Sequence, residues 1–458
     1  MVPMTAPSPR TVPWLALWLP LLAGAQGLPP APHAEVHDLT PQPGFFTEPS
    51  IAINPRDPRQ VVAAFQDNAH ISFSTDSGAH WQAATGIEPA NYRTSGDVSV
   101  TFDNRGRAVV CYMAFDKLGR FNYWAHGATR NGLFVRRSLD GGATWEANHN
   151  PIIEHPSEPG IPWEDKPYIV ADDTNGPYGG NLYVGWTRWT LTDSQIRLSR
   201  STDGGLTWSA PVEIDAKRGL PRDDNGALEG FAGAVGGDGT LYAVWSANAT
   251  LQFTLSRDGG RTFAPPRDIL QTGPTMFQLQ AFSRANGFPQ IAVDRRAGKR
   301  GWLYVTWSDY RNGGVDVFCA ASSDDGRTWL QPVRVNSDPL HNGADHFFQW
   351  LAADPVTGDV DVLFYDRRAD PQNRAQTVTL ARSTDGGRTF ADYAWTAAAF
   401  QTNNSVFMGD YSGIAAYDGR VYGVWTEKPD SQTRGTVVRV GVADFRASTA
   451  GATAAPLE

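Results

Sequence analysis

One octapeptide of the pattern S-x-D-x-G-x-T-W recurs along the chain, and it limits the possible folds more than any other feature. Six close copies begin at Ser74, Ser138, Ser201, Ser256, Ser322 and Ser383. Successive copies start 55 to 66 residues apart, which leaves room for about four short strands and their turns. A regular repeat of this length predicts a β-propeller in which each blade carries one copy.

Paired hydrophobic runs precede each octapeptide. Residues 49–54 with 61–65, and 289–294 with 303–307, are examples, and Gly, Pro or Asp turns bound them, as is typical of buried strands. A further pair within residues 410–425 has no octapeptide after it. We expect its missing outer strand to come from the N-terminal part of the chain, around residues 34–39, which would close the ring and remove an exposed edge. The predicted fold is an all-β propeller of seven four-stranded antiparallel blades, with a six-bladed ring containing one split blade as the alternative.

The octapeptide itself has the chemistry of a turn. Its Asp side chain can accept hydrogen bonds from backbone amides of the same turn, its Gly supplies a positive φ, and its aromatic residue can pack against the blade. We therefore expect the six copies to be structural and to lie between the third and fourth strands of their blades.

The two ends of the chain carry separate signals. Arg10 precedes an apolar run over residues 13–25 that ends in small residues, the pattern of a secretion signal. This run is too short to span a membrane as a stable helix. The sequence predicts a signal peptide over residues 1–25, a single propeller domain over residues 26–445 and a disordered tail over residues 446–458. We expect a secreted or periplasmic monomer with no membrane span.

Charge and composition exclude several kinds of partner and cofactor. The net charge of −9 argues against nucleic acid, because phosphate binding needs a basic stripe. The nine His are scattered without metal-binding spacing, so we expect no catalytic metal and no cofactor. Residues 172–176 (Asp-Asp-Thr-Asn-Gly) are acidic enough to suggest a structural Ca²⁺, but the same pattern is typical of a strand turn.

The octapeptides resemble the Asp boxes, or bacterial neuraminidase repeats, of the sialidase superfamily, and the resemblance covers about residues 45–445. It implies a secreted glycoside hydrolase of the exo-α-sialidase type that acts on acidic sugars. The segment Asp-Tyr-Ser-Gly-Ile at 410–414 is similar to the stretch that holds the family's nucleophilic tyrosine. By that resemblance Tyr411 would be the nucleophile and Glu427 its supporting carboxylate; otherwise this stretch is simply the seventh blade. The stretch that matches the family's Arg-Ile-Pro is Phe-Thr-Glu-Pro at 46–49, so the acidic Glu48 stands where the resemblance implies an arginine that grips a sialate carboxylate.

Candidate site residues fall in the loops expected on the face opposite the octapeptides, where propellers usually place their sites. Alignment of the first strands puts Glu48, Asp97, Lys166 and Asp410 at one repeat position near the central channel. The three carboxylates at this position could act as acid and base, hold a cation or pair with arginines. The predicted catalytic residues are Tyr411, Glu427, Asp67 and Asp97, and the predicted substrate-binding residues are Arg311, Arg368, Asp410, Glu48 and His126.

Three functions fit these observations. The first is the sialidase-like exo-glycosidase, in which Arg311 and Arg368 would bind an acidic sugar. The second is a non-catalytic propeller that binds a glycan or protein, favoured by the missing Arg-Ile-Pro. The third is a uronate polysaccharide lyase that would use Tyr123, His126 or His346 as base and acid. In the enzyme interpretations the partner is a glycan or polysaccharide substrate.

Overall fold

The computed structural model describes residues 27–66, 69–84, 87, 92, 94–116, 130–156, 162–296, 301–396, 398–430 and 432–446. The predicted signal peptide and all but the first residue of the predicted tail lie outside these ranges and remain predictions. Asp67, Tyr123 and His126 also lie outside them. Within the described ranges, no helix has the length and apolar character needed to cross a bilayer.

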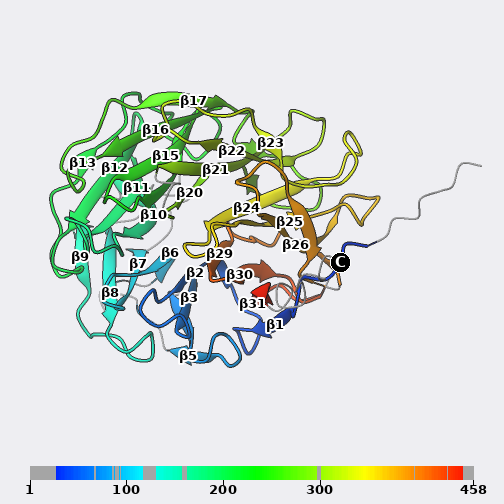
Figure 1. The fold of residues 1–458 in the computed structure, drawn as a ribbon, viewed down its shortest axis with the longest axis horizontal. Coiled ribbons are helices and arrows are strands. Elements are labelled where there is room, and N and C mark those ends of the chain that lie inside the picture. Colours follow the sequence, from blue (N-terminus) through cyan, green and yellow to red (C-terminus); the bar gives the residue numbers. More distant parts are fainter. Residues whose placement is uncertain are drawn as a thin grey trace, which may run out of the picture.

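Seven antiparallel sheets surround a central axis as the blades of a propeller (Figure 1). Blade one contains β2 (Thr47–Ile53), β3 (Val61–Gln66), β4 (His70–Ser74) and β5 (Gln82–Ala84). Blade two contains β6 (Thr94–Phe102), β7 (Ala108–Phe115), β8 (Asn131–Ser138) and β9 (Asn150–His155). Blade three contains β10 (Trp163–Ala171), β11 (Leu182–Trp189), β12 (Ser194–Ser201) and β13 (Val212–Glu213). Blade four contains β14 (Leu228–Val235), β15 (Leu241–Ala247), β16 (Thr250–Ser256) and β17 (Arg267–Gln271).

Blade five contains β20 (Gln290–Asp294), β21 (Trp302–Asp309), β22 (Asp316–Ser322) and β23 (Val333–Arg334). Blade six contains β24 (His346–Ala353), β25 (Val360–Asp366), β26 (Ala375–Ser383) and β27 (Ala391–Ala394), and β28 (Phe400–Gln401) also pairs with β26. Blade seven contains β29 (Gly413–Tyr417), β30 (Arg420–Glu427) and β31 (Val437–Asp444), completed by β1 (Glu35–Asp38). The prediction of seven four-stranded blades is confirmed, and the six-bladed alternative is wrong.

The N-terminal strand closes the ring. β1 runs antiparallel to β31, with Glu35 opposite Val442 and Asp38 opposite Arg439. The pairing continues past the strand, where the Leu39 amide donates to the Val438 carbonyl at 2.9 Å. In Figure 1 the blue β1 accordingly lies beside the red β31. The predicted closing segment is therefore confirmed, and blade seven has no open outer edge on β31.

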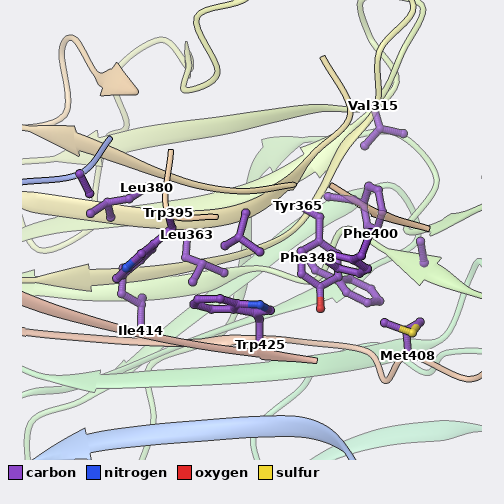
Figure 2. Packing of buried hydrophobic residues seen from close by; sticks show 14 of the residues in the cluster. Val315, Phe348, Leu363, Tyr365, Leu380, Trp395, Phe400, Met408, Ile414 and Trp425 are labelled. Atoms are coloured by element: carbon purple, nitrogen blue, oxygen red, sulfur yellow. The ribbon is translucent and has the colours of Figure 1, made fainter. Parts of the chain in front are cut away.

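Each pair of neighbouring blades encloses its own hydrophobic cluster, so the core is a ring of seven clusters. This explains why the second and third strands of each blade are apolar on both faces: each sheet is covered on either side by another sheet. Figure 2 shows the cluster between blades six and seven, where Trp395 and Trp425 pack at 5.9 Å between ring centroids. Leu363 and Ile414 belong to the same cluster, one from each of the two blades.

The six octapeptides form nearly identical turns between the third and fourth strands. In the copy at 138–145, Ser138 Oγ donates to Asp140 Oδ1 at 2.8 Å, and Asp140 Oδ1 accepts the Thr144 amide at 2.9 Å. Trp145 Nε1 donates to the Gly142 carbonyl at 3.0 Å. The Asp side chain thus organises its own turn, as the sequence predicts. Since every inner strand begins at the end opposite these turns, the candidate site residues gather on the other face.

A short hairpin stands outside the blades. β18 (Met276–Phe277) pairs with β19 (Ala285–Asn286) in the connection from blade four to blade five. Its Phe277 and Phe282 belong to the cluster between blades six and seven, so the connection reaches over blade six. This hairpin forms part of the candidate site.

Candidate active site

The inner strands of five blades bulge near their first residues, and the bulges shape the mouth of the central channel. The pairing with the second strand shifts in register at this point in β2, β6, β10, β14 and β24. At the bulge Glu48, Asp97, Lys166, Gly230 and Phe348 all have positive φ, between 44° and 72°. Such a conformation is uncommon for residues other than Gly, and bulges re-aim side chains next to functional sites. Glu48, Asp97 and Lys166, aligned by the sequence repeat, therefore occupy equivalent positions in blades one, two and three.

A pocket of about 630 Å³ opens at this mouth. Its rim carries two aromatic side chains that are unusually exposed for their type, Phe45 at 75% and Phe407 at 41%. Arg434, also exposed, lies at the same rim. The volume lies within the usual range for a small-molecule site. Exposed rings beside a polar interior are suited to stacking against the faces of sugar rings.

Three buried carboxyl groups form a hydrogen-bonded row in the lining of the pocket. Glu48 bonds to Asp97, and Asp97 bonds to Asp165. Asp165 Oδ2 also accepts Trp189 Nε1 at 2.8 Å. Burial raises the pKa of Glu48 to about 7, and burial together with the charge of Glu48 raises the pKa of Asp97 well above its usual value. The row therefore keeps protons at pH values where an ordinary carboxyl group has lost them.

Two cations, Lys166 and Arg284, lie close enough to this row to act against the rise in the pKa of Glu48. Lys166 Nζ lies 2.8 Å from Asp410 Oδ2 and 3.0 Å from Glu229 Oε1. Arg284 Nε donates to Asp410 Oδ1 at 2.8 Å, and its Nη1 pairs with Asp223. Burial acts against ionisation of Asp410, but Arg284 and Lys166 lower its pKa to about 2. The site thus combines carboxyl groups that hold protons with one that is firmly ionised.

Tyr411 occupies a separate cavity of about 30 Å³ deeper in the channel. Its ring packs on Trp350 with 5.4 Å between centroids, and Tyr168 also packs on Trp350 at 6.0 Å. Burial, followed by the charges of Glu48 and Asp97, raises the pKa of Tyr411 well above its usual value. Lys166 borders both this cavity and the larger pocket. The phenol therefore lies within electrostatic reach of the carboxyl row.

Three other predicted residues bind partners elsewhere. Glu427 Oε2 lies 3.0 Å from Arg439 Nε and accepts Trp425 Nε1 at 3.4 Å. Arg311 forms a paired contact with Asp309, two residues before it. Arg368 makes a similar contact with Asp366 and also binds Asp392 Oδ2 at 2.6 Å. Among the residues that line the 630 Å³ pocket within the described ranges, Glu48 and Asp97 belong to the predicted set, and Asp410 contacts that lining through Lys166 and Arg284.

Sequence reasoning missed Arg284, Phe45, Phe407 and Arg434. Arg284 lies in the β18–β19 connection, which has no counterpart in the other repeats. The available signal was the unassigned stretch between the fourth octapeptide and the strand pair that starts at residue 289. Phe45, Phe407 and Arg434 lie in connections outside the strand pattern, where nothing in the sequence distinguishes a rim residue from any other exposed one.

One cluster has the composition of a metal site. Ligand atoms of Asp316, Asp338 and His346 lie within 4.8 Å of one another, and all three residues are buried. Asn336 Nδ2 donates to both carboxylates at 2.7 Å, and Arg334 binds both at 2.8 to 2.9 Å. These cationic and amide donors already occupy the oxygen atoms that a metal ion would need, so the cluster is satisfied as an ion-pair network.

The acidic segment at 172–176 forms a closed turn. Asp172 Oδ1 accepts the Thr174 amide at 3.0 Å and the Thr174 hydroxyl at 2.5 Å. Asp173 pairs with Arg295. The observed contacts are those of a strand turn, the second of the two predicted interpretations.

Comparison with known proteins gives two curated relatives. A xyloglucanase from a Paenibacillus species is 27% identical over 223 residues, which is 44% of this chain and 20% of that protein. A sialidase from Bacteroides fragilis is 26% identical over 215 residues, 39% of this chain and 37% of that protein. The matches thus extend over about a fifth and just over a third of the lengths of these relatives. No family model matches the chain.

A solved structure confirms the architecture. An ulvan lyase of polysaccharide lyase family PL25 superposes with a TM-score of 0.52 and covers 86% of this chain and 93% of its own. At 10% sequence identity this likeness concerns the fold alone. The sequence similarity to a sialidase confirms the resemblance to the sialidase-like superfamily that the octapeptides indicate.

Proposed function

We propose that this protein is a sialidase-like exo-glycosidase that cleaves terminal sugars from glycans in the pocket at the mouth of the propeller. The observation that carries the proposal is the hydrogen-bonded pair of Glu48 and Asp97, buried in the wall of that pocket. Glycoside hydrolysis needs a carboxyl group that is still protonated near neutral pH, and burial raises the pKa of Glu48 to about 7. The relatives named as a sialidase and a xyloglucanase support the same class of reaction.

The shape of the site favours action on chain ends. A pocket of about 630 Å³ suits one or two sugar units better than a long chain laid across the surface. Phe45 and Phe407 at the rim would stack on the first rings outside the cleaved bond. Arg434 at the rim offers a cation to an acidic sugar, but inside the pocket Lys166 and Arg284 are already paired with carboxylates. We therefore infer that the pocket accepts neutral sugars as well as acidic ones.

We assign roles by proximity and protonation. The Glu48–Asp97 pair gives its proton to the glycosidic oxygen as the bond to the anomeric carbon breaks. Tyr411 then serves as the nucleophile, because its phenol lies near the same carboxyl row and can pass its proton to it. Water then attacks the resulting glycosyl-tyrosine: the carboxyl pair, which holds the proton received from Tyr411, returns a proton to the departing tyrosine oxygen and takes the proton that the water loses. Asp410, held ionised by Arg284 and Lys166, stabilises positive charge that develops on the sugar ring.

The first experiment measures sugar release by the purified protein from sialosides, uronic-acid polysaccharides, xyloglucan oligosaccharides and arabinans. We expect turnover of at least one substrate, with Asp97→Asn and Glu48→Gln lowering kcat about 100-fold or more. Tyr411→Phe tests the nucleophile, and Glu427→Gln tests the supporting carboxylate that the family resemblance implies. Since Glu427 binds Arg439 and Trp425, we expect Glu427→Gln to retain most of the activity. Full activity in Asp97→Asn would refute the proposal.

The second candidate is a glycan-binding propeller without turnover. It is favoured by the exposed rim rings, which would serve binding equally well, and by the depth of Tyr411 below the main pocket. Saturable binding on a glycan array, with no reducing ends released from the bound glycan, would establish it. In either case we propose a secreted or periplasmic protein, on the strength of the leader pattern in residues 1–25.

A further inference from the structure

The β18–β19 hairpin extends over blades five and six and places Arg284 in the lining of the pocket. Met276 pairs with Asn286 and Phe277 with Ala285, so residues 278–284 form the tip. This tip has two sets of contacts. One set is with the ends of strands in blades five and six, and the other is with the segment 402–410 that leads into blade seven.

Blades five and six hold the hairpin with residues at the same repeat position. Tyr310 follows the aspartate that ends β21, and Arg367 follows the aspartate that ends β25. The Tyr310 hydroxyl donates to the Gln278 carbonyl at 3.3 Å. Arg367 Nη1 donates to the Gln280 carbonyl at 3.0 Å. Two successive blades therefore bind backbone carbonyls that lie two residues apart in the hairpin.

Aromatic rings strengthen both contacts. Phe277 meets Tyr310 edge-to-face with 5.0 Å between centroids. The Arg367 guanidinium lies 5.8 Å from the centre of the Phe282 ring and 5.1 Å from that of Phe347. These interactions are each worth about 0.5–2 kcal/mol.

Arg367 is an unusual residue in energetic terms. Its side chain is fully buried, and its hydrogen bonds go to the Gln280 and Asn373 carbonyls and the Gln376 amide oxygen. No carboxylate among the described residues lies within ion-pair distance of it, and burial lowers its pKa to about 10. A buried guanidinium without a carboxylate is costly. Its contacts with the hairpin are a gain that can offset this cost.

The tip of the hairpin is fastened to the segment 402–410. Ser283 Oγ donates to the Val406 carbonyl at 2.9 Å, and Thr402 Oγ1 donates to the Ala281 carbonyl at 2.8 Å. Arg284 follows Ser283 in the chain and binds Asp410 and Asp223. Val406 lines the same pocket wall as Arg284. The hairpin and this segment thus make one continuous wall.

We propose that Arg367 and Tyr310 are positioning residues that hold the β18–β19 hairpin over blades five and six, and thereby seat Arg284 in the wall of the sugar pocket. This inference rests on the proposed function of that pocket. If the hairpin lifts, Arg284 leaves Asp410, and Lys166 remains as the cation beside that carboxylate. The wall that includes Val406 and Phe407 is then no longer fixed, so the pocket binds sugar less well while the carboxyl row of blades one to three stays in place.

The test compares Arg367→Met, Arg367→Lys and Tyr310→Phe with the wild-type protein. Tyr422→Phe is the matched control, because the Tyr422 hydroxyl donates to the Ser77 carbonyl at 3.1 Å, a bond of the same kind on the octapeptide face. We expect Arg367→Met to raise KM about tenfold or more, with a smaller change in kcat. Arg367→Lys should recover part of the loss, since it keeps a charge that can donate to a carbonyl. Tyr310→Phe should give a smaller rise in KM, and Tyr422→Phe none.

Two measurements without substrate separate this inference from the proposed function. Hydrogen exchange followed by mass spectrometry reports the opening of residues 276–286, and phenylglyoxal labelling with peptide mapping reports how well Arg284 is seated. In Arg367→Met we expect both rates to rise several-fold, while Tyr422→Phe leaves them unchanged. Unchanged exchange and labelling in Arg367→Met would overturn the inference, as would faster exchange with an unaltered KM. If the wild-type protein acts on no glycan, the proposed function fails, and the exchange and labelling rates still decide whether Arg367 seats Arg284.

Discussion

Replacing the buried acid of the pocket should make the protein more stable at alkaline pH. Glu48 is 1% exposed, and its pKa rises from 4.5 to about 7, mainly because burial opposes its ionisation. A carboxyl group with a raised pKa contributes its full stability below the unfolded-state value and loses it as pH rises through the folded-state value. Glu48→Gln keeps the shape, and its amide oxygen can still accept the hydrogen bond from Asp97, but it cannot ionise. The variant should therefore keep its stability as the pH rises through the folded-state pKa of Glu48.

The magnitude follows from the two pKa values. The difference of about 2.5 between 7 and 4.5, at about 1.4 kcal/mol per pH unit, corresponds to roughly 3–4 kcal/mol above pH 7. Below pH 4.5 the side chain is protonated in both states, and the advantage of the variant should fall to about zero. Glu48→Gln would then raise stability at alkaline pH and lower activity, since it removes the proposed acid.

Thermal unfolding of the wild-type protein and Glu48→Gln at pH 4.5, 6 and 8 measures this dependence. The difference in Tm should grow with pH and favour the variant. Glu164→Gln is the matched control: it removes an equally buried glutamate whose pKa is lowered, despite burial, by His155 and Arg188. That control should lose stability at pH 8. A Tm difference for Glu48→Gln that is the same at all three pH values, or that favours the wild type at pH 8, would refute the reasoning.

Three further predictions concern the ring itself. His346 has a raised pKa because Asp366 binds it despite burial, so the contribution of this pair is complete at pH 5 and declines as pH rises past the ordinary imidazole range; thermal unfolding of His346→Asn should show its largest loss at pH 5. A Cβ at Gly441 would lie 2.2 Å from Trp395 Nε1, so Gly441→Ala should lower the free energy of unfolding by about 1–3 kcal/mol in urea titrations. Removing residues 27–38 opens the edge of β31, and light scattering should show aggregation that the intact protein does not show.

Much of the fold could be predicted because the repeat indicates where each blade lies in the chain and where its strands begin and end. The octapeptides mark where third strands end, and the paired apolar runs mark the inner strands. The absence of a final octapeptide indicated that blade seven needed a strand from elsewhere. The same repeat brought Glu48, Asp97 and Lys166 into one alignment, and the structure shows them at equivalent bulges.

The chemistry of the site was harder to predict, because its contacts join residues from several blades. Lys166 meets Asp410 across the channel, and no local pattern pairs residues so far apart. The motif Asp-x-Arg suggested Arg311 and Arg368 as ligands for an acidic sugar, yet each contacts an aspartate two residues before it. Arg284 lies in a hairpin without a repeat counterpart. Positions of this kind depend on tertiary contacts rather than on periodicity.

The closure of the ring also has a consequence for synthesis. β1 pairs with β31 about 400 residues later in the chain. At the usual rate of about 5–20 residues per second, the first strand waits on the order of 20–80 s for its partner. Bringing two such distant segments together costs about 5 kcal/mol in chain entropy. Closure of the ring must therefore follow synthesis of β31, and until then β1 and blade seven leave backbone groups unpaired.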